Sequence, residues 1–326
     1  MKTEGTIMTQ IRSVAAIPRR AGELGVHSLD QFRFSVPDLW RAEEFYTCFG
    51  LKLANRGNGF DIYAEAHSHR WGTIVEGPTK QLGHISFAAY EEDFPRFRTR
   101  LEGFGIKRLD PPSGFESNGL WFHDPDGVLI EIRVAEKTSP NVKSIVDNSS
   151  APAGVQAAPF RQQAKRVTPR RLAHMLIFTS DVGNAIEFYS RVLGLRLSDR
   201  SGDGIAFMHG IHGSDHHLIA FAKAEGPGLH HLSWDVGSTH EVGLGAKQMA
   251  DKGFASGWGV GRHVLGSNFF HYVRDPWGSY SEYSSDIDYI AFDQDWEAAD
   301  HPADEAFYIW GPTPPEDFAV NYELAG

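Results

Sequence analysis

Apolar residues in this chain recur with two spacings, and the two spacings alternate along the sequence. Short apolar runs at Phe32–Val36 and Met175–Thr179 are typical of buried strands. Each run precedes a segment, 38–51 or 181–195, whose apolar residues fall three and four apart and predict an amphipathic helix. Both segments contain a Phe-Tyr pair and have a glycine next to their last residue, which is typical of a helix end. The same strand–helix unit is therefore predicted twice.

Motifs further along the chain echo each other in the same way. The sequence GHISF at 83–87 resembles HHLSW at 230–234. The turn sequence DPDG before Glu131 likewise resembles DPWG before Glu282. Each half can be divided again into two units of the order βαβββ. We therefore predict an α+β protein with two domains, each built from two such units.

The second half gives the clearest individual elements. Ser238 and Glu241 form a plausible capping box before a helix, and Gly253 a plausible stop after it. The expected helices are 183–193 and 239–252, and the expected strands are 172–179, 195–200, 204–209, 216–222, 229–236, 256–263, 268–274 and 278–286.

Composition sets the boundaries between these parts. We expect an N-terminal extension at 1–26, a non-catalytic domain at 27–135, a linker at 136–170, a catalytic domain at 171–290 and a tail at 291–326. The linker is rich in Ser, Pro, Ala, Gln and Lys, which favours an irregular connection. The tail is acidic but contains several aromatic residues, so we expect it to pack on the body.

Bulk properties narrow the class of protein. The chain has 326 residues, 41% of them hydrophobic and 22% charged, as in folded proteins of ordinary composition. A net charge of -11 argues against a nucleic-acid partner. No apolar run approaches a membrane span, and residues 1–5 lack a signal-peptide pattern. The single cysteine, Cys48, excludes an internal disulfide. A cytoplasmic location is the resulting expectation.

Three side chains in the second half form a candidate metal site. Alternation along the strand at 229–236 places His231 on a mixed, polar face and His230 on the apolar face. Glu282 shares a mixed face with its neighbours in the last strand, and His174 occupies in its unit the position that His231 has in the next. Two imidazoles and one carboxylate are the ligand set of non-haem Fe(II) oxygen enzymes, although each residue alone would more often be structural.

The second half also contains a more specific pattern, which runs from Gly261-Arg262-His263 through Tyr272 and DPWG (275–278) to Glu282. In this pattern the chain resembles the type I extradiol ring-cleavage dioxygenases of the vicinal oxygen chelate superfamily. The resemblance covers 171–290, and more weakly the first half. It implies the glyoxalase fold, in which each pair of βαβββ units forms an incomplete barrel. It also implies that His174, His231 and Glu282 bind Fe(II), with Mn(II) as a possible replacement.

The resemblance further assigns three residues to catalysis. His217 matches the family's acid–base histidine, and His263 and Tyr272 match the residues near the substrate oxygens. The neighbouring His216 and His230 are expected to face away and to be structural. The implied reaction opens the ring of a catechol beside its two hydroxyls, with both atoms of O2 incorporated, in aromatic-compound catabolism. The family also suggests a homo-oligomer.

The first half departs from this ligand pattern. Gln31 stands where the second half has His174, while His84 and Glu131 match His231 and Glu282. We therefore interpret the first half as a non-catalytic duplicate. A second metal site on these three residues is the lesser alternative.

Two other functions remain open at this point. One is a glyoxalase-like isomerase or lyase with Zn(II) or Ni(II), against which His217, His263 and Tyr272 argue. The other is a binding module for an aromatic compound, which would not need a complete ligand triad. The substrate is also open, because a simple catechol, a bicyclic diol and a catechol with a carboxylate arm would all suit the site. Arg262 and Arg274 could receive an anionic substituent.

Overall fold

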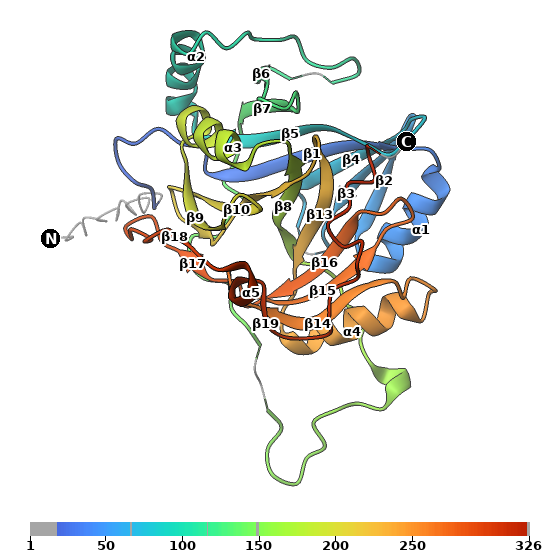
Figure 1. Ribbon diagram of the computed structural model, residues 1–326. Coiled ribbons are helices and arrows are strands. Elements are labelled where there is room, and N and C mark those ends of the chain that lie inside the picture. Colours follow the sequence, from blue (N-terminus) through green and yellow to red (C-terminus); the bar gives the residue numbers. More distant parts are fainter. Residues whose placement is uncertain (1–17, 66, 116, 148–149, 325–326) are drawn as a thin grey trace, which may run out of the picture.

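The computed structural model describes residues 18–65, 67–115, 117–147 and 150–324, and these form two mixed β-sheets with few helices (Figure 1). Most of the predicted N-terminal extension, residues 1–17, lies outside the described residues. In the described part of the chain, no helix has the length and apolarity needed to cross a membrane.

The first sheet has seven strands in the order β2-β3-β4-β1-β5-β7-β6. Its strands are β1 (Ser28–Val36), β2 (Lys52–Arg56), β3 (Gly59–Tyr63), β4 (Arg70–Glu76), β5 (Gln81–Ala89), β6 (Leu120–His123) and β7 (Leu129–Val134). Its helices are α1 (Leu39–Phe49) and α2 (Phe94–Gly103), the latter preceded by a 3-10 turn at Glu91–Asp93.

The second sheet has ten strands in the order β18-β9-β10-β12-β8-β13-β16-β15-β14-β19. Its strands are β8 (Arg171–Thr179), β9 (Leu195–Ser201), β10 (Ile205–Gly210), β12 (Ile219–Lys223), β13 (Gly228–Asp235), β14 (Gly257–His263), β15 (Phe269–Arg274), β16 (Tyr280–Ser285), β18 (Ala299–Asp300) and β19 (Tyr308–Trp310). The remaining elements are the β11 (Ser214–Asp215) and β17 (Tyr289–Ile290) pair, α3 (Val182–Phe188) with a π-helical turn at Tyr189–Leu193, α4 (Thr239–Ala250), α5 (Ala303–Ala306) and a 3-10 turn at Arg161–Gln163.

The two sheets repeat one topology. In the first, β1 runs parallel to β4 and antiparallel to β5, and in the second, β8 runs parallel to β12 and antiparallel to β13. The units are then completed by the parallel pairs β5–β7 and β13–β16. Both sheets remain open, in agreement with the incomplete barrels of the predicted glyoxalase fold. The second unit of the first half has three strands and one isolated bridge in place of four strands, since Pro111 and Pro112 cannot donate to a ladder.

Polar side chains cap the starts of three helices. Asp38 and Asp181 each accept a hydrogen bond from a backbone N–H in the first turn of their helix. Ser238 does the same for α4, while the Glu241 carboxylate accepts from the Gly237 N–H rather than from Ser238. These side chains accept hydrogen bonds from backbone N–H groups that have no partner within the helix.

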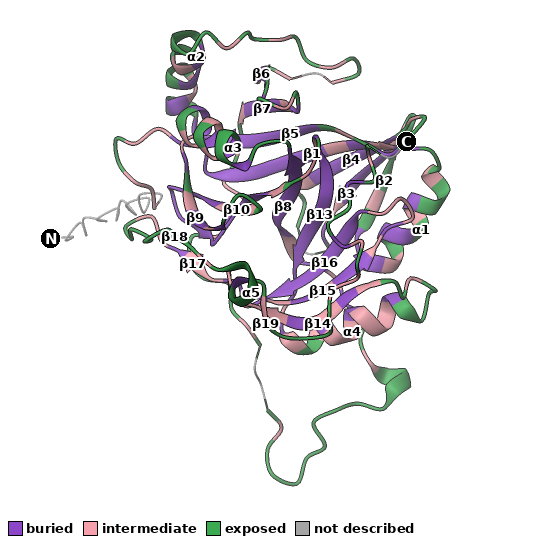
Figure 2. Cartoon of the chain, in the orientation of Figure 1, coloured by how far each residue is buried: buried purple, intermediate pink, exposed green. Residues whose placement is uncertain are grey.

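The two halves share one apolar core. Buried side chains from both sheets belong to the same cluster, and Figure 2 shows the central strands buried along most of their length. The rings of Phe49 and Tyr283 stack with centroids 3.9 Å apart, and the Tyr283 hydroxyl donates to the Phe49 carbonyl at 2.7 Å. The first half therefore packs directly against β16, the strand that carries Glu282.

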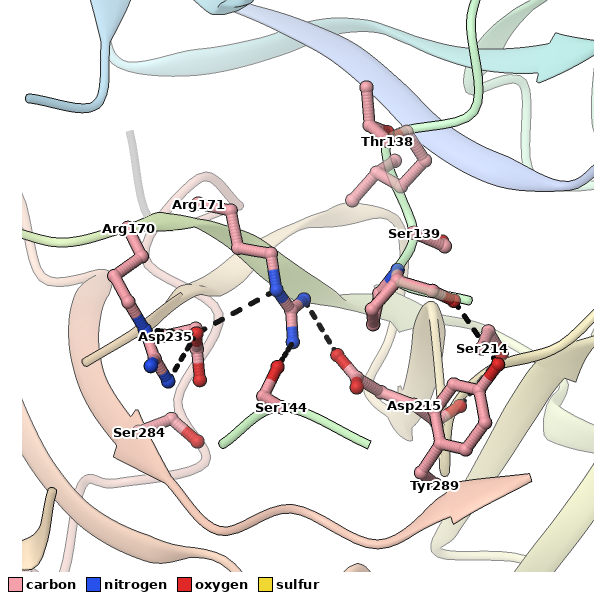
Figure 3. A network of polar contacts seen from close by, with 12 residues as sticks. Thr138, Ser139, Ser144, Arg170, Arg171, Ser214, Asp215, Asp235, Ser284 and Tyr289 are labelled. Atoms are coloured by element: carbon pink, nitrogen blue, oxygen red, sulfur yellow. Dashed lines mark hydrogen bonds and ion pairs between the residues drawn. The ribbon is translucent and has the colours of Figure 1, made fainter. Parts of the chain in front are cut away.

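A buried charge network fixes the start of β8 (Figure 3). Arg171 lies 2.7 Å from a carboxylate oxygen of Asp215 and donates to Ser144 of the linker at 3.0 Å. Asp235, at the end of β13, accepts from Arg170 at 2.8 Å and lies 3.7 Å from Arg171. These contacts set the relative position of β8 and β13. Beyond them, the linker extends away from both sheets, whereas the tail lies along the second sheet (Figure 1).

Gly50 provides a test of the contact between the first half and the linker. Gly50 has a φ of +103°, so Gly50→Ala should be strained. An added Cβ would lie 2.2 Å from the Val167 carbonyl oxygen, which predicts a clash as well. Gly105→Ala is the matched control, with a φ of +68° and nothing within 4 Å of the added atom. We expect Gly105→Ala to cost about 1–2 kcal/mol of unfolding free energy. Gly50→Ala should cost at least about 1 kcal/mol more because of the clash, as measured by urea unfolding. Equal losses would contradict the contact.

Candidate metal centre

The three predicted ligands lie on three adjacent strands of the second sheet. His174 is on β8, His231 on β13 and Glu282 on β16, and Ser233 of β13 is in register with both His174 and Glu282. The Glu282 Oε2 atom lies 3.4 Å from His174 Nε2 and 3.7 Å from His231 Nε2. One potential ligand atom from each residue falls within 4.8 Å of the others. The order β8-β13-β16 therefore brings together three residues that are 51 to 108 positions apart in the sequence.

The site has the properties that a divalent metal requires. All three side chains are buried, and both His231 Nε2 and Glu282 Oε2 lack a hydrogen-bond partner within the described chain. Burial lowers the pKa of His231 well below its ordinary value, which keeps the imidazole neutral. Burial raises the pKa of Glu282, but the neighbouring His174 and His263 rings outweigh this effect, and the net pKa is lowered. A neutral imidazole and an ionised carboxylate are the forms that bind metal, so the residues fit such an ion.

His230 has a different place from the one expected. A β-bulge between Leu229 and His231 breaks the strict alternation of β13, and His230 lines the same cavity as His231. The two Nδ1 atoms of His230 and His231 lie 2.8 Å apart, and His230 Nε2 lies 2.9 Å from the Phe318 carbonyl oxygen. Because the carbonyl can only accept, His230 carries its proton on Nε2 and accepts from Nδ1–H of His231. His231 Nε2 is thereby left as a lone pair for a ligand bond.

Asn268 was not found by sequence reasoning. Its amide donates to Glu282 Oε1 and to the Ser284 hydroxyl, each at 3.0 Å, and its side chain is buried. This contact occupies one oxygen of Glu282 and leaves Oε2 facing the two histidines. No motif marks Asn268 in the sequence, because the contact depends on the pairing of β15 with β16.

The three predicted catalytic residues surround the same cavity. The rings of His217 and His174 have centroids 4.0 Å apart, and those of Tyr272 and His231 are 5.1 Å apart. The Tyr272 hydroxyl lies 2.9 Å from His263 Nε2, whose ring donates through Nδ1 to the Phe307 carbonyl at 2.9 Å. Burial and then the charge of Glu282 raise the pKa of Tyr272 well above its ordinary value, so the phenol stays protonated and donates to His263.

The cavity above these residues has a volume of about 310 Å³. Its wall is largely apolar and comes from the second sheet and the tail, with lining residues that include Leu176, Ile205, Phe207, Leu265, Ala303, Ala306, Phe307, Phe318 and Ala319. Arg262 and Arg274 do not line it. Arg274 instead binds the carboxylate of Asp317, and Arg262 donates to the Ser267 carbonyl at 3.0 Å. The two arginines suggested by the sequence are therefore occupied elsewhere.

The counterpart in the first half is built differently. Gln31 accepts from Arg70 at 2.9 Å, and Glu131 accepts from the Ser86 and Ser117 hydroxyls. Neither nitrogen of His84 has a hydrogen-bond partner among the described residues. Within the described ranges, the single grouping of three or more metal-binding side chains is His174, His231 and Glu282.

Comparison with known proteins gives a consistent assignment. Residues 28–132 and 171–283 match the family model for the Glyoxalase/Bleomycin resistance protein/Dioxygenase superfamily. Metapyrocatechase 2 of Cupriavidus necator is 48% identical over 309 residues, which cover 95% of each chain. Metapyrocatechase of Geobacillus stearothermophilus is 28% identical over 80% of this chain and 81% of its own length.

Two solved structures have the same overall arrangement. The Mn(II)-bound glyoxalase of Novosphingobium aromaticivorans has a TM-score of 0.73 and 25% identity, and the match covers 90% of this chain and 94% of that one. Homoprotocatechuate 2,3-dioxygenase of Brevibacterium fuscum has a TM-score of 0.73 and 20% identity over 93% of this chain and 84% of that one. The fold alone therefore does not distinguish the two kinds of chemistry.

His84 predicts a measurable pH dependence of stability. Burial lowers the pKa of His84 to about 3, whereas an unfolded chain binds the same proton near pH 6.5. The neutral His84 ring therefore makes its full contribution to the unfolding free energy above pH 6.5. This contribution is lost as the pH falls from 6.5 towards 3.

The unfolding free energy of the unaltered chain should therefore fall between pH 7 and pH 5, as measured by urea unfolding. In His84→Leu this fall should be smaller by about 2 kcal/mol. Between pH 7 and pH 8 the two curves should run parallel, which serves as the control. Parallel curves down to pH 5 would contradict the lowered pKa.

Proposed function

The chain belongs to the Glyoxalase/Bleomycin resistance protein/Dioxygenase superfamily and is an extradiol ring-cleavage dioxygenase, and from this premise we propose that it opens catechols with Fe(II) and O2. His174, His231 and Glu282 would hold the metal. The observation that carries this proposal is a pair of buried atoms, His231 Nε2 and Glu282 Oε2, which have no hydrogen-bond partner among the described residues and lie 3.7 Å apart beside His174. Such atoms are costly to bury unless a cation binds them.

A bound Fe(II) would supply an open coordination face for the two adjacent oxygens of a catechol and for O2. Mn(II) suits the same donor types, and relatives of this chain include a dioxygenase named as manganese-dependent and one named as iron-dependent. The donor set therefore leaves the choice between these two metals to measurement.

The remaining site residues would manage protons and orientation. Burial lowers the pKa of His217 well below its ordinary value, so its neutral ring can accept a proton from a substrate hydroxyl and later return it. Tyr272 keeps its proton and can donate a hydrogen bond to a substrate oxygen when its contact with His263 opens. His263 is held by the Phe307 carbonyl and so keeps Nε2 as an acceptor towards the cavity.

The sequence alone left a glyoxalase-like isomerase or lyase as an alternative, and the Mn(II)-bound glyoxalase has a similar fold. The 48% identity to Metapyrocatechase 2 favours ring cleavage. The positions of His217, His263 and Tyr272 favour it as well, because all three line one cavity beside the triad.

The cavity also favours one class of catechol. Its wall is mainly aliphatic and aromatic, and among the described residues Lys223 is the one lysine or arginine that lines it, with its ammonium donating to the Ser180 carbonyl. Arg274 is neutralised by Asp317 outside the cavity. We therefore propose a catechol that carries hydrogen or an apolar substituent, since a buried carboxylate arm would lack a partner.

The metal assignment predicts different outcomes for different histidines. His231→Ala and Glu282→Ala should lose both bound iron and activity after anaerobic reconstitution with Fe(II), because each removes a ligand. His217→Ala should keep one iron per chain and lose about 10²–10⁴ in kcat, as expected for an acid–base group. Iron content and O2 uptake with a catechol measure the two effects.

His84→Ala is the matched control for these variants, because His84 is the counterpart of His231 in the first half. It should retain iron and turnover. Full activity in an iron-free His231→Ala protein would contradict the assignment of the site.

The apolar wall predicts a substrate preference. The kcat/KM for 4-methylcatechol should exceed that for 3,4-dihydroxyphenylacetate by at least about tenfold, which corresponds to about 1.4 kcal/mol. Ala319→Arg, which adds a cation to the wall, should narrow this ratio. A preference for the carboxylate in the unaltered enzyme would show that Lys223 or another cation receives it.

A further inference from the structure

A line of hydrogen bonds connects His217 with the protein surface. His217 Nδ1 lies 3.0 Å from His216 Nδ1, and His216 Nε2 lies 2.8 Å from Asp199 Oδ2. The other carboxylate oxygen, Asp199 Oδ1, lies 2.7 Å from His301 Nε2 in the tail. His216 is completely buried, whereas the His301 side chain is 36% exposed. The sequence predicted that His216 is structural, and in the described chain its ring connects His217 with Asp199.

The local fold builds this line from distant segments. A β-bulge in β9 lies beside Asp199, and Ser198 next to it donates to the His216 carbonyl at 2.5 Å. The tail strand β18 pairs in parallel with β9 and brings Ala299 into register with Asp199, which places His301 two residues further on. Trp296 and His216 pack with ring centroids 5.3 Å apart. The position of the Asp199 carboxylate is therefore fixed from both sides.

The carboxylate determines where the protons lie. Burial raises the pKa of Asp199, but the hydrogen bonds from His216 and His301 outweigh it, and the net pKa is lowered. An ionised carboxylate can only accept, so His216 must carry a proton on Nε2. If His216 is neutral, its Nδ1 is then an acceptor and receives Nδ1–H of His217. The proton on His217 Nδ1 leaves Nε2 of the same ring as a lone pair.

We propose that Asp199 and His216 are positioning residues that hold His217 with its proton on Nδ1, so that Nε2 presents a lone pair to the cavity. This inference rests on the proposed function only in giving His217 its task as a base. The same polarity occurs at His230 and His231, where the Phe318 carbonyl takes the place of Asp199. In both pairs the first histidine is anchored by an acceptor and the second keeps Nε2 free.

The competing arrangement has a protonated His216. His216 would then donate to both Asp199 and His217, and His217 would carry its proton on Nε2. The two arrangements differ in the tautomer of His217, which is an observable that does not depend on turnover.

The decisive experiment is ¹⁵N spectroscopy of the histidine rings in the full-length chain. Selectively ¹⁵N-histidine-labelled protein would be loaded with Zn(II), which is diamagnetic, and the His217 signals assigned by their absence in His217→Gln. We expect an N–H at Nδ1 and a lone pair at Nε2 in the unaltered chain at pH 7.5. An N–H at Nε2 would overturn the proposal, even if Asp199→Leu could not be folded.

Variants separate positioning from simple packing. Asp199→Leu removes the acceptor and should produce a second His217 population with the proton on Nε2. Its kcat should fall at least about tenfold, with metal content and KM within about twofold, because a misdirected base loses part of its contribution. His301→Leu removes the contact between Asp199 and the tail but keeps the hydrogen bond between Asp199 and His216, so the tautomer of His217 should stay unchanged. Asp203→Leu, at an exposed site in the same hairpin, should match the unaltered enzyme in both measurements.

Each failure has its own signature. Absence of O2 uptake with any catechol in the unaltered, Fe(II)-loaded enzyme would overturn the proposed function without touching the tautomer result. A single Nδ1–H tautomer in Asp199→Leu would overturn the role of Asp199. Equal losses of kcat in Asp199→Leu and His301→Leu, with no change of tautomer, would assign both residues to packing.

Discussion

The arrangement of the second domain follows from one costly feature, a fully buried carboxylate surrounded by neutral imidazoles. Glu282 has no solvent exposure, and its Oε2 atom lies 3.4 Å from His174 Nε2 and 3.7 Å from His231 Nε2. An ionised group in such surroundings needs either hydrogen-bond donors or a cation. Asn268 provides a donor for one oxygen only. The strand order, the bulge in β13 and the buried arginine–aspartate network at the start of β8 all serve to keep the other oxygen facing the two histidines, where a divalent ion can neutralise it.

Neutral histidines add a second requirement, because each ring has two nitrogens and only one can bind a metal or accept a substrate proton. The protein resolves this by pairing histidines along the chain. His230 and His216 each contact an acceptor on the outer side, and each turns Nε2 of the next residue towards the cavity. Metal binding and acid–base chemistry therefore depend on the same local device. Its outer acceptors, the Phe318 carbonyl and the Asp199 carboxylate, both lie in or against the tail.

Period-two alternation predicted the inward positions of His231 and Glu282, and the repeat predicted that of His174, because these strands obey local rules. The same reasoning failed for His230, since a bulge interrupts the alternation and the residue lines the cavity. His216 was expected to begin a strand, but it precedes β12. Asn268 could not be predicted, because its contact with Glu282 requires the tertiary pairing of β15 with β16. The start of α4 was predictable from Ser238, whereas the π-helical turn after α3 left no signal in the sequence.

The tail has a consequence for how such an enzyme can diversify. It stands outside the repeated units, yet it contributes Phe307 and Phe318 both to the cavity wall and, through their carbonyl oxygens, to the anchoring of two site histidines. The second contribution comes from main-chain atoms, which survive any side-chain replacement that preserves the local backbone. Selection can therefore change the shape and polarity of the wall residue by residue while the anchoring persists. Insertions or deletions in the tail, in contrast, would disturb both at once, so divergence in this lineage should proceed there by substitution rather than by changes in length.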